Sequence, residues 1–229
     1  SHIPFIEKHK WELLLYICSN IEFLGVERCY IHNESSEKNN YLEPTLYLEK
    51  LQVLVISDCA TCPIEPILYV CKSAPNISKL SVSGCNFNER QMCEMLSFCS
   101  NLRDIKLGSH AGPSMTAVGN AGGDNFAKTL TEKCRFLIGA DLTGIISMTD
   151  VGWTRLMLDL GPKLQKLYIR RAMQISLDSF LLVRCCVNLK RLTIANVPHL
   201  TDGVLSVLLE AIGPQLSFLQ LEALGITNE

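Results

Sequence analysis

The sequence lacks the features that mark a membrane protein or a secreted one. It has no uninterrupted apolar run near the roughly 20 residues that a membrane-spanning helix needs, and the longest cluster near its start covers residues 13–18. Its first residues contain no basic stretch followed by an apolar signal core. We therefore expect a protein without a membrane partner and without a secretion signal.

A strong net charge is absent as well. The chain has 21 basic and 23 acidic residues, which gives a formal charge of -2. A chain so close to neutrality has no overall attraction for nucleic acid or for an anionic membrane. Hydrophobic residues make up 48% of its 229 residues, which is too many for a largely disordered chain. We expect a substantial core and no nucleic-acid partner, and any binding that depends on charge must be local.

The sequence also lacks the motifs of catalytic and cofactor sites. The glycine-rich residues 108–123 have neither the Gly-Lys-Ser/Thr ending of a phosphate-binding loop nor the order of a dinucleotide turn. His32, His110 and His199 lie in different parts of the chain, and no nucleophile elbow or His-Glu-x-x-His pair accompanies them. Cys59 and Cys62 have the spacing of a redox pair or a zinc half-site, but no second pair stands at a suitable distance. We expect no enzyme activity, no cofactor and no metal.

Cysteine, in contrast, is abundant. The chain has eleven cysteines, an odd number, whereas secreted domains usually hold an even set at compact spacing in a disulfide frame. Several of them recur at matching places in an internal repeat, for example Cys29, Cys59 and Cys85. This pattern favours reduced, buried thiols that act as small apolar residues in a cytoplasmic or nuclear protein.

That repeat is an apolar-x-x-apolar-x-apolar core that occurs eight times. The first residues of successive copies are separated by 30, 26, 25, 35, 27, 25 and 27 residues. Most of these intervals lie within the range of about 20 to 29 residues that is typical of leucine-rich repeats. The copies are Ile21/Leu24/Val26, Leu51/Leu54/Ile56, Ile77/Leu80/Val82, Leu102/Ile105/Leu107, Leu137/Ala140/Leu142, Leu164/Leu167/Ile169, Leu189/Leu192/Ile194 and Leu216/Leu219/Leu221.

The stretches between these cores have helical spacing of apolar residues, for example at Val204, Leu205 and Leu208. Thr149 and Thr201, each followed by Asp, precede two of them, where a side-chain oxygen can accept hydrogen bonds from the free amides of a first helical turn. Each repeat is therefore predicted to be strand, turn and helix.

Because a helix is wider than the spacing of about 4.8 Å between strands, stacked repeats bend with the strands on the inside. The sequence predicts an α/β fold, a leucine-rich-repeat solenoid with a concave parallel sheet of about eight strands and helices on the convex side. We expect one domain over residues 1–229. Residues 1–20 would form an N-terminal capping helix or the remnant of a preceding repeat, and residues 21–229 about eight repeats, the last incomplete.

The repeat resembles the cysteine-containing leucine-rich repeats of F-box/leucine-rich-repeat proteins. Residues 18–29 (CSNIEFLGVERC) show both cysteines of that pattern, and residues 137–156 and 189–208 show its Thr-Asp step into a helix. The resemblance covers nearly the whole chain. It implies a substrate-binding domain, while a separate F-box module binds the adaptor of a cullin ubiquitin ligase. No F-box is visible in this sequence, so the adaptor would bind through regions outside it.

A partner is expected on the concave face. Side chains alternate along a strand, so the residues between the apolar positions point outward. From the third strand onward they gather basic residues, with Arg170 and Arg171 at the rim, that are opposed only by Asp104 and Asp141. Such cations suit an acidic or phosphorylated segment of a protein, and aromatic side chains add contact area. The predicted partner-binding residues are Lys79, Arg103, Lys106, Lys166, Tyr168, Arg170, Arg171, Lys190, Arg191 and Phe218. The alternative interpretation is a solvated face whose charges serve solubility.

Two hypotheses about function follow. The first is the substrate-recognition domain of a cullin-type ubiquitin ligase. The second is a scaffold without enzymatic activity that holds a permanent partner in a larger complex, because many unrelated assemblies use the same repeats.

The glycine-rich residues 108–123 lengthen the fourth repeat and form either a rim loop that touches a partner or a loop without a role.

Overall fold

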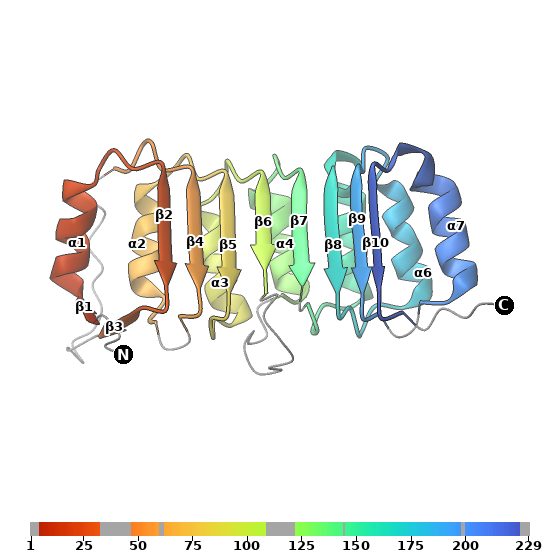
Figure 1. Cartoon of the computed structure of the whole chain (residues 1–229), viewed down its shortest axis with the longest axis horizontal. Coiled ribbons are helices and arrows are strands. Elements are labelled where there is room, and N and C mark those ends of the chain that lie inside the picture. The colour runs from red at the N-terminus through yellow and green to blue at the C-terminus, as the bar shows by residue number, and fades with distance from the viewer. Residues whose placement is uncertain are drawn as a thin grey trace.

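Eight parallel strands form a single sheet in the structure, a computed structural model that describes residues 5–32, 47–59, 62–108, 122–143, 145–197 and 200–224. The strands are β2 (Phe23–Glu27), β4 (Val53–Ser57), β5 (Lys79–Ser83), β6 (Asp104–Leu107), β7 (Gly139–Thr143), β8 (Lys166–Arg170), β9 (Arg191–Ala195) and β10 (Phe218–Glu222). They lie side by side in chain order from β2 to β10 (Figure 1). This order and the parallel pairing confirm the predicted leucine-rich-repeat solenoid.

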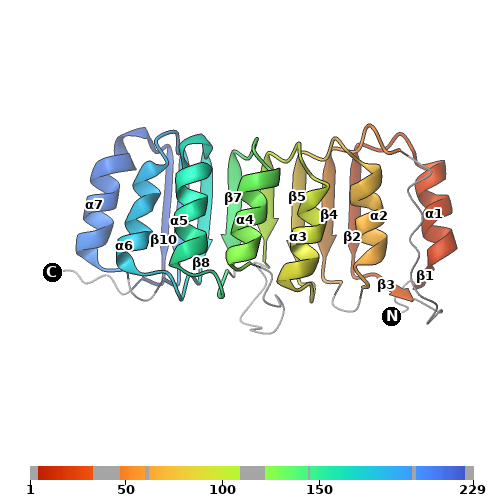
Figure 2. The same ribbon diagram turned by 180° about the vertical axis from the view of Figure 1, so that it is seen from behind.

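The helices pack against one face of the sheet. They are α1 (Lys8–Ile17), α2 (Glu65–Ser73), α3 (Glu89–Ser97), α4 (Asp124–Lys133), α5 (Asp150–Asp159), α6 (Leu177–Phe180) and α7 (Asp202–Ile212), with short 3-10 helices η1 (Gly161–Lys163), η2 (Leu181–Cys185) and η3 (Gly213–Gln215). Seen from behind, α2 to α7 cover one face of the sheet (Figure 2). We call the other face, which these helices do not cover, the open face.

The N-terminal residues hold a feature that the sequence pattern did not predict. Helix α1 covers ten of the residues 1–20, where a helix was expected before the first repeat. Just before it, β1 (Phe5–Glu7) pairs in parallel with β3 (Tyr30–His32) in a separate two-stranded sheet. No helix in the described part of the chain is both long and apolar enough to cross a membrane.

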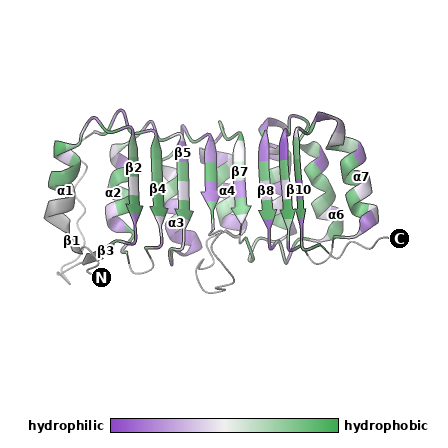
Figure 3. Ribbon diagram, in the orientation of Figure 1, coloured by the Kyte–Doolittle hydropathy of each residue, from purple (hydrophilic) through white to green (hydrophobic). Residues whose placement is uncertain are grey.

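The core lies between the sheet and the helices. In Figure 3 the strands and the helices both carry apolar residues, and the repeat pattern explains which of them are buried. From the second copy to the seventh, all three apolar positions are at most 6% exposed. The eighth copy differs, because Leu219 and Leu221 are 41% and 36% exposed. Both lie on β10, which is an edge strand of the sheet, so the prediction of a buried position is wrong for these two leucines.

The cysteines behave largely as the repeat pattern predicts. All eleven are free thiols, and seven of them are buried. Burial raises the pKa of Cys134 and of Cys186 to about 12, because a thiolate loses its hydration in an apolar core. These thiols stay protonated at neutral pH and pack as small apolar residues. Cys18, Cys29, Cys93 and Cys185 are only partly buried.

Each strand ends in a turn of the same backbone geometry. After seven of the eight strands of the large sheet, the next residue has a positive φ between 48° and 86°. The remaining strand is β7, and residue 144 after it lies outside the described residues. The seven residues are Arg28, Asp58, Gly84, Gly108, Arg171, Asn196 and Ala223. This left-handed conformation turns the chain toward the helix layer and recurs in these seven repeats.

The predicted helix starts are confirmed at both Thr-Asp steps. Thr149 is the N-cap of α5, and its hydroxyl accepts a hydrogen bond from the Val151 amide at 3.2 Å. Thr201 caps α7 in the same way, with the Val204 amide at 3.5 Å. Both satisfy amides that lack partners in the first turn of a helix.

Successive helices are also joined at their N-termini by carboxylates. The Glu89 carboxylate, on the first residue of α3, accepts a hydrogen bond from the Phe126 amide of α4 at 2.9 Å. The Asp150 carboxylate, on the first residue of α5, accepts one from the Ser176 amide at 2.7 Å. This bond holds the pKa of Asp150 below its usual range, because it stabilises the charged form. One acidic residue thus fastens each of these repeats to the next.

Asp124, the first residue of α4, makes the most extensive of these connections. Its carboxylate accepts hydrogen bonds from the Thr149 amide at 2.9 Å, the Thr149 hydroxyl at 2.7 Å and the Gly152 amide at 3.1 Å. We expect Asp124→Ala to lower the free energy of unfolding by about 2 kcal/mol, because charge-assisted bonds are lost and two amides lose their acceptor. Urea denaturation followed by far-UV circular dichroism measures this change.

The control for this prediction is Asp124→Asn, which keeps one acceptor oxygen in the same place. We expect it to lose less stability than the alanine variant, by about half. Equal stability of wild type and Asp124→Ala would contradict the role that we assign to this carboxylate.

Candidate functional site

The open face consists of the first, third and fifth residue of each strand. Burial alternates along the strands, for example in β2, where Leu24 and Val26 are buried and Phe23, Gly25 and Glu27 are exposed. The register of the paired strands aligns the following residues with these exposed positions and so places them on the open face: Val53, Val55 and Ser57; Lys79, Ser81 and Ser83; Asp104 and Lys106; Gly139, Asp141 and Thr143; Lys166, Tyr168 and Arg170; Arg191, Thr193 and Ala195; Phe218, Gln220 and Glu222.

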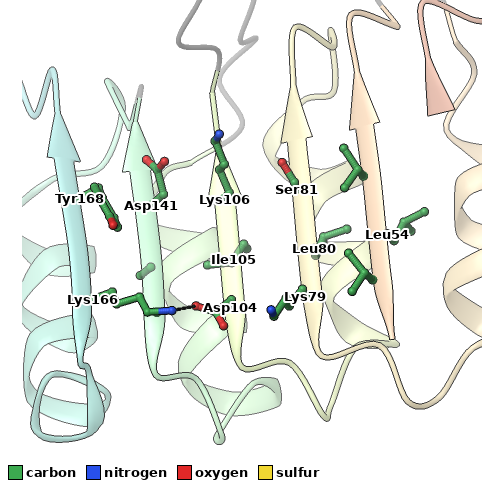
Figure 4. Close-up of a pocket in the computed structure, with 14 residues that line it drawn as sticks. Leu54, Lys79, Leu80, Ser81, Asp104, Ile105, Lys106, Asp141, Lys166 and Tyr168 are labelled. Carbon is green, nitrogen blue, oxygen red and sulfur yellow. Dashed lines mark hydrogen bonds and ion pairs between the residues drawn. The ribbon is translucent and has the colours of Figure 1, made fainter. Parts of the chain in front are cut away.

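A hollow of about 450 Å³ lies on this face over β4 to β8. Its apolar side is formed by Val53 and Val55 of β4, and Tyr168 of β8 bounds the opposite side. Figure 4 shows the side chains between them, which come from β5, β6, β7 and β8. These side chains belong to Lys79, Ser81, Asp104, Lys106, Asp141 and Lys166. The hollow is therefore apolar at one end and charged in its middle.

Two ion pairs cross the open face, each over a small residue. The Lys166 ammonium lies 3.5 Å from the Asp104 carboxylate, although the two residues stand on β8 and β6 (Figure 4). Gly139 of β7 is in register with both of them. The Arg170 guanidinium of β8 likewise reaches the Glu222 carboxylate of β10 at 2.6 Å. In this pair the small residue is Ala195 of β9, again in register with both partners.

Gly139 is the residue that allows the first of these pairs to form. A Cβ atom at this position would come within 2.0 Å of the Asp104 carboxylate and 3.6 Å of the Lys166 side chain. Any larger side chain would therefore displace Asp104 from its contact with Lys166.

Further along the sheet, Arg191 of β9 and Phe218 of β10 form a contact of another kind. The Arg191 guanidinium lies over the Phe218 ring, 4.5 Å from the ring centre. This cation-π contact uses both predicted binding residues within the domain itself.

Three of the predicted binding residues lie at the ends of strands. Arg103 and Lys190 are exposed and precede β6 and β9 by one residue, outside the alternation of the open face. Arg171 follows β8 and occupies the left-handed turn, with its backbone amide bonded to the Ala195 carbonyl at 3.1 Å. The structure therefore brings Lys79, Lys106, Lys166, Tyr168, Arg170, Arg191 and Phe218 onto the open face and leaves these three at its edges.

The open face carries charges of both signs, where the sequence pattern predicted a basic one. Its strands contribute the cations of Lys79, Lys106, Lys166, Arg170 and Arg191. They also contribute acidic residues, of which Glu27 and Glu222 are the fifth residues of β2 and β10. The prediction covered the charges from the third strand onward, which left out Glu27, and it looked beyond the third apolar residue only in the sixth repeat, at Arg170 and Arg171, which left out Glu222. Alternation continued by one more residue would have found them.

Asp141 is the most buried charged residue of the open face, with 7% of its surface exposed. Its carboxylate accepts a hydrogen bond from the Thr143 hydroxyl at 2.6 Å and one from the Thr143 amide at 3.2 Å. These bonds offset part of the cost of removing the carboxylate from water.

Residues 109–121, which hold most of the glycine-rich insertion and His110, lie outside the described residues.

Cys59 and Cys62 are both buried, and desolvation raises the pKa of Cys62 to about 12. Within the described ranges, no group of three or more His, Cys, Asp or Glu side chains is placed to hold a metal ion.

Comparisons with known proteins bear on the fold. No protein-family model matches the chain, and no curated protein sequence matches it. A solved structure of the Rad7 and Elc1 complex in yeast is similar, with a TM-score of 0.54 and 20% sequence identity over 75% of this chain. The match covers 42% of the other chain, so this chain spans less than half of its length. At this identity the likeness shows the shared architecture of a parallel sheet with helices on one side.

Proposed function

We propose that this chain is a protein-interaction domain, the substrate-recognition part of a cullin-type ubiquitin ligase. The observation that carries the proposal is the open face, a parallel sheet that the helices leave uncovered and that holds a hollow of about 450 Å³. Solenoids use such extended faces to bind other proteins. The face combines apolar, aromatic and charged side chains, which is the composition of a protein-binding surface.

One further observation supports the ligase context, because the cysteine-containing repeat resembles that of F-box/leucine-rich-repeat proteins. The similar solved structure is a complex of two proteins, Rad7 and Elc1, which supports a role in protein binding. In this proposal the domain binds its substrate without catalysing a reaction, in the cytoplasm or the nucleus. The adaptor binds through regions of the protein outside residues 1–229.

Affinity purification of the full-length protein from its native cells tests this function. We expect a cullin and its adaptor to copurify, together with substrates that accumulate when the proteasome is inhibited. A stoichiometric partner without any cullin subunit would instead favour the scaffold function and would overturn the ligase proposal.

A further inference from the structure

The ion pairs of the open face leave its cations unequal. Lys166 and Arg170 are already paired with Asp104 and Glu222, and Arg191 stacks on an aromatic ring. A cation that is already paired gains less from a new carboxylate, because the existing contact must weaken first. Of the five cations that the strands bring to this face, Lys79 and Lys106 alone have no ion pair or ring contact with any described residue.

These two lysines lie together in the hollow. Lys79 stands on β5 and Lys106 on the neighbouring strand β6, two residues further along in register. Their Cα atoms are therefore roughly 8 Å apart, given strands about 4.8 Å apart and a rise of about 3.3 Å per residue. Ser81, which is in register with Lys106, adds a hydroxyl between them. Figure 4 shows all three side chains on the same side of the sheet.

An apolar surface adjoins the lysines. Val53 and Val55 on β4 are only partly buried and line the same hollow, and Val53 is in register with Lys79. Phe23 on β2, next in the sheet, is 59% exposed and is in register with Val53. A ligand in this half of the hollow meets apolar carbon on one side and ammonium groups on the other.

We propose that the half of the hollow over β4, β5 and β6 binds an extended acidic segment of a protein partner. Carboxylates at two positions of the segment contact Lys79 and Lys106, and a neighbouring apolar side chain lies on Val53 and Val55. This inference rests on the proposed function as a protein-binding domain, and it names the chemistry of the partner.

The spacing fits an extended peptide. Residues i and i+2 of a strand point to the same side and lie about 6.6 Å apart, close to the separation of the two lysines. Two acidic residues with one residue between them can therefore reach both ammonium groups, and charge complementarity fixes the position of the segment.

A nucleic acid fits this surface less well than a peptide. Asp104 and Asp141 line the same hollow, and the carboxylate of Glu222 lies further along the face. Double-stranded DNA carries one negative charge for about every 1.7 Å of its axis, so a bound duplex would bring phosphates close to these carboxylates. Lys79 is in register with Asp104 and Lys106 with Asp141. Asp104 is already paired with Lys166 and Asp141 accepts hydrogen bonds from Thr143, so the few charges of a short peptide meet less repulsion than the regular phosphates of a duplex.

A peptide library tests the proposal. The chain is used to select binders from a displayed library of random linear peptides, and the enriched peptides are synthesised and their affinities measured by fluorescence anisotropy. We expect the enriched peptides to carry two acidic residues at positions i and i+2, with an aliphatic or aromatic residue close by. We expect Lys79→Glu with Lys106→Glu to weaken these peptides at least tenfold.

The matched control is Lys128→Glu with Lys133→Glu, which makes the same charge change on exposed lysines of α4, on the helix side. We expect this variant to bind the peptides as the wild type does, and far-UV circular dichroism checks that both variants are folded. If no linear peptide is enriched, or if both variants weaken the peptides equally, the proposal is wrong. Tighter binding of a labelled oligonucleotide than of any acidic peptide would also overturn it.

The two proposals fail in different ways. Acidic peptides that bind through Lys79 and Lys106 would support the binding site even if no cullin copurifies with the full-length protein. Copurification of a cullin, with no effect of the double lysine variant on any peptide, would support the ligase function and reject this binding site.

Discussion

Replacing Trp153 by alanine is expected to lower the free energy of unfolding by about 3 to 5 kcal/mol, the range for removing a large aromatic side chain from a core. Trp153 is fully buried on α5 and stacks on Phe180, with ring centres 5.9 Å apart and planes inclined by 9°. Its indole N–H donates to the Ser179 carbonyl at 2.9 Å. The variant thus loses packing and hydrogen bonding between one repeat and the next, and urea denaturation measures the effect.

The control is Val151→Ala on the same helix, because Val151 is 74% exposed. We expect its stability to differ from the wild type by less than about 0.5 kcal/mol. Since each repeat of a solenoid contacts only its neighbours, we also expect a broader transition for Trp153→Ala, as the halves on either side of α5 separate. An unchanged denaturation curve for Trp153→Ala would mean that this contact does not join the repeats.

Gly108→Ala is expected to lower the free energy of unfolding by about 2 to 3 kcal/mol, more than the left-handed conformation alone would cost. Gly108 follows β6 with a φ of +86°, and a Cβ atom there would lie 2.6 Å from the Thr143 carbonyl oxygen. Backbone atoms of two repeats must then move apart. Thermal and urea denaturation both measure this loss.

Gly203→Ala is the opposite case and serves as the control. Gly203 lies in the first turn of α7, and a Cβ atom there would meet nothing within 4 Å. We expect this variant to be more stable than the wild type by up to about 1 kcal/mol, because alanine loses less backbone entropy on folding. If the two alanine variants changed stability alike, the crowding at Gly108 would not be the cause.

The periodicity of the sequence predicted most of the fold. The spacing of the apolar triplets determines which side chains face the helices, and parallel pairing then follows because each copy is joined to the next by a helix. Cys134 and Leu142 are buried as that spacing requires. The prediction of burial was wrong for Leu219, because β10 is an edge strand and burial also depends on a neighbouring strand.

Contacts between repeats could not be predicted in the same way. The pair of Lys166 and Asp104 joins residues 62 positions apart in the sequence and depends on the small size of Gly139 between them. Only the register of three strands reveals such a pair. The prediction therefore counted Lys166 as a free cation, whereas the structure shows that Asp104 already neutralises it.

The left-handed turns left a weaker signal that the sequence does contain. The residue that follows each strand is one or two places beyond the third apolar position, and in three copies it is Gly84, Gly108 or Asn196, residue types that tolerate a positive φ. Arg28 and Arg171 hold the same conformation without such a preference, and they hide the pattern.

Carbene footprinting of the domain with a copurified substrate tests the central claim most directly, because it reports which side chains a bound protein covers. If the open face is the binding surface, labelling of Val53, Val55 and Lys79 falls when the substrate binds, while that of Val151 and Leu158 on α5 stays unchanged. Protection of the α5 residues, with β4 and β5 labelled as in the free protein, would place the substrate on the helices and contradict this account.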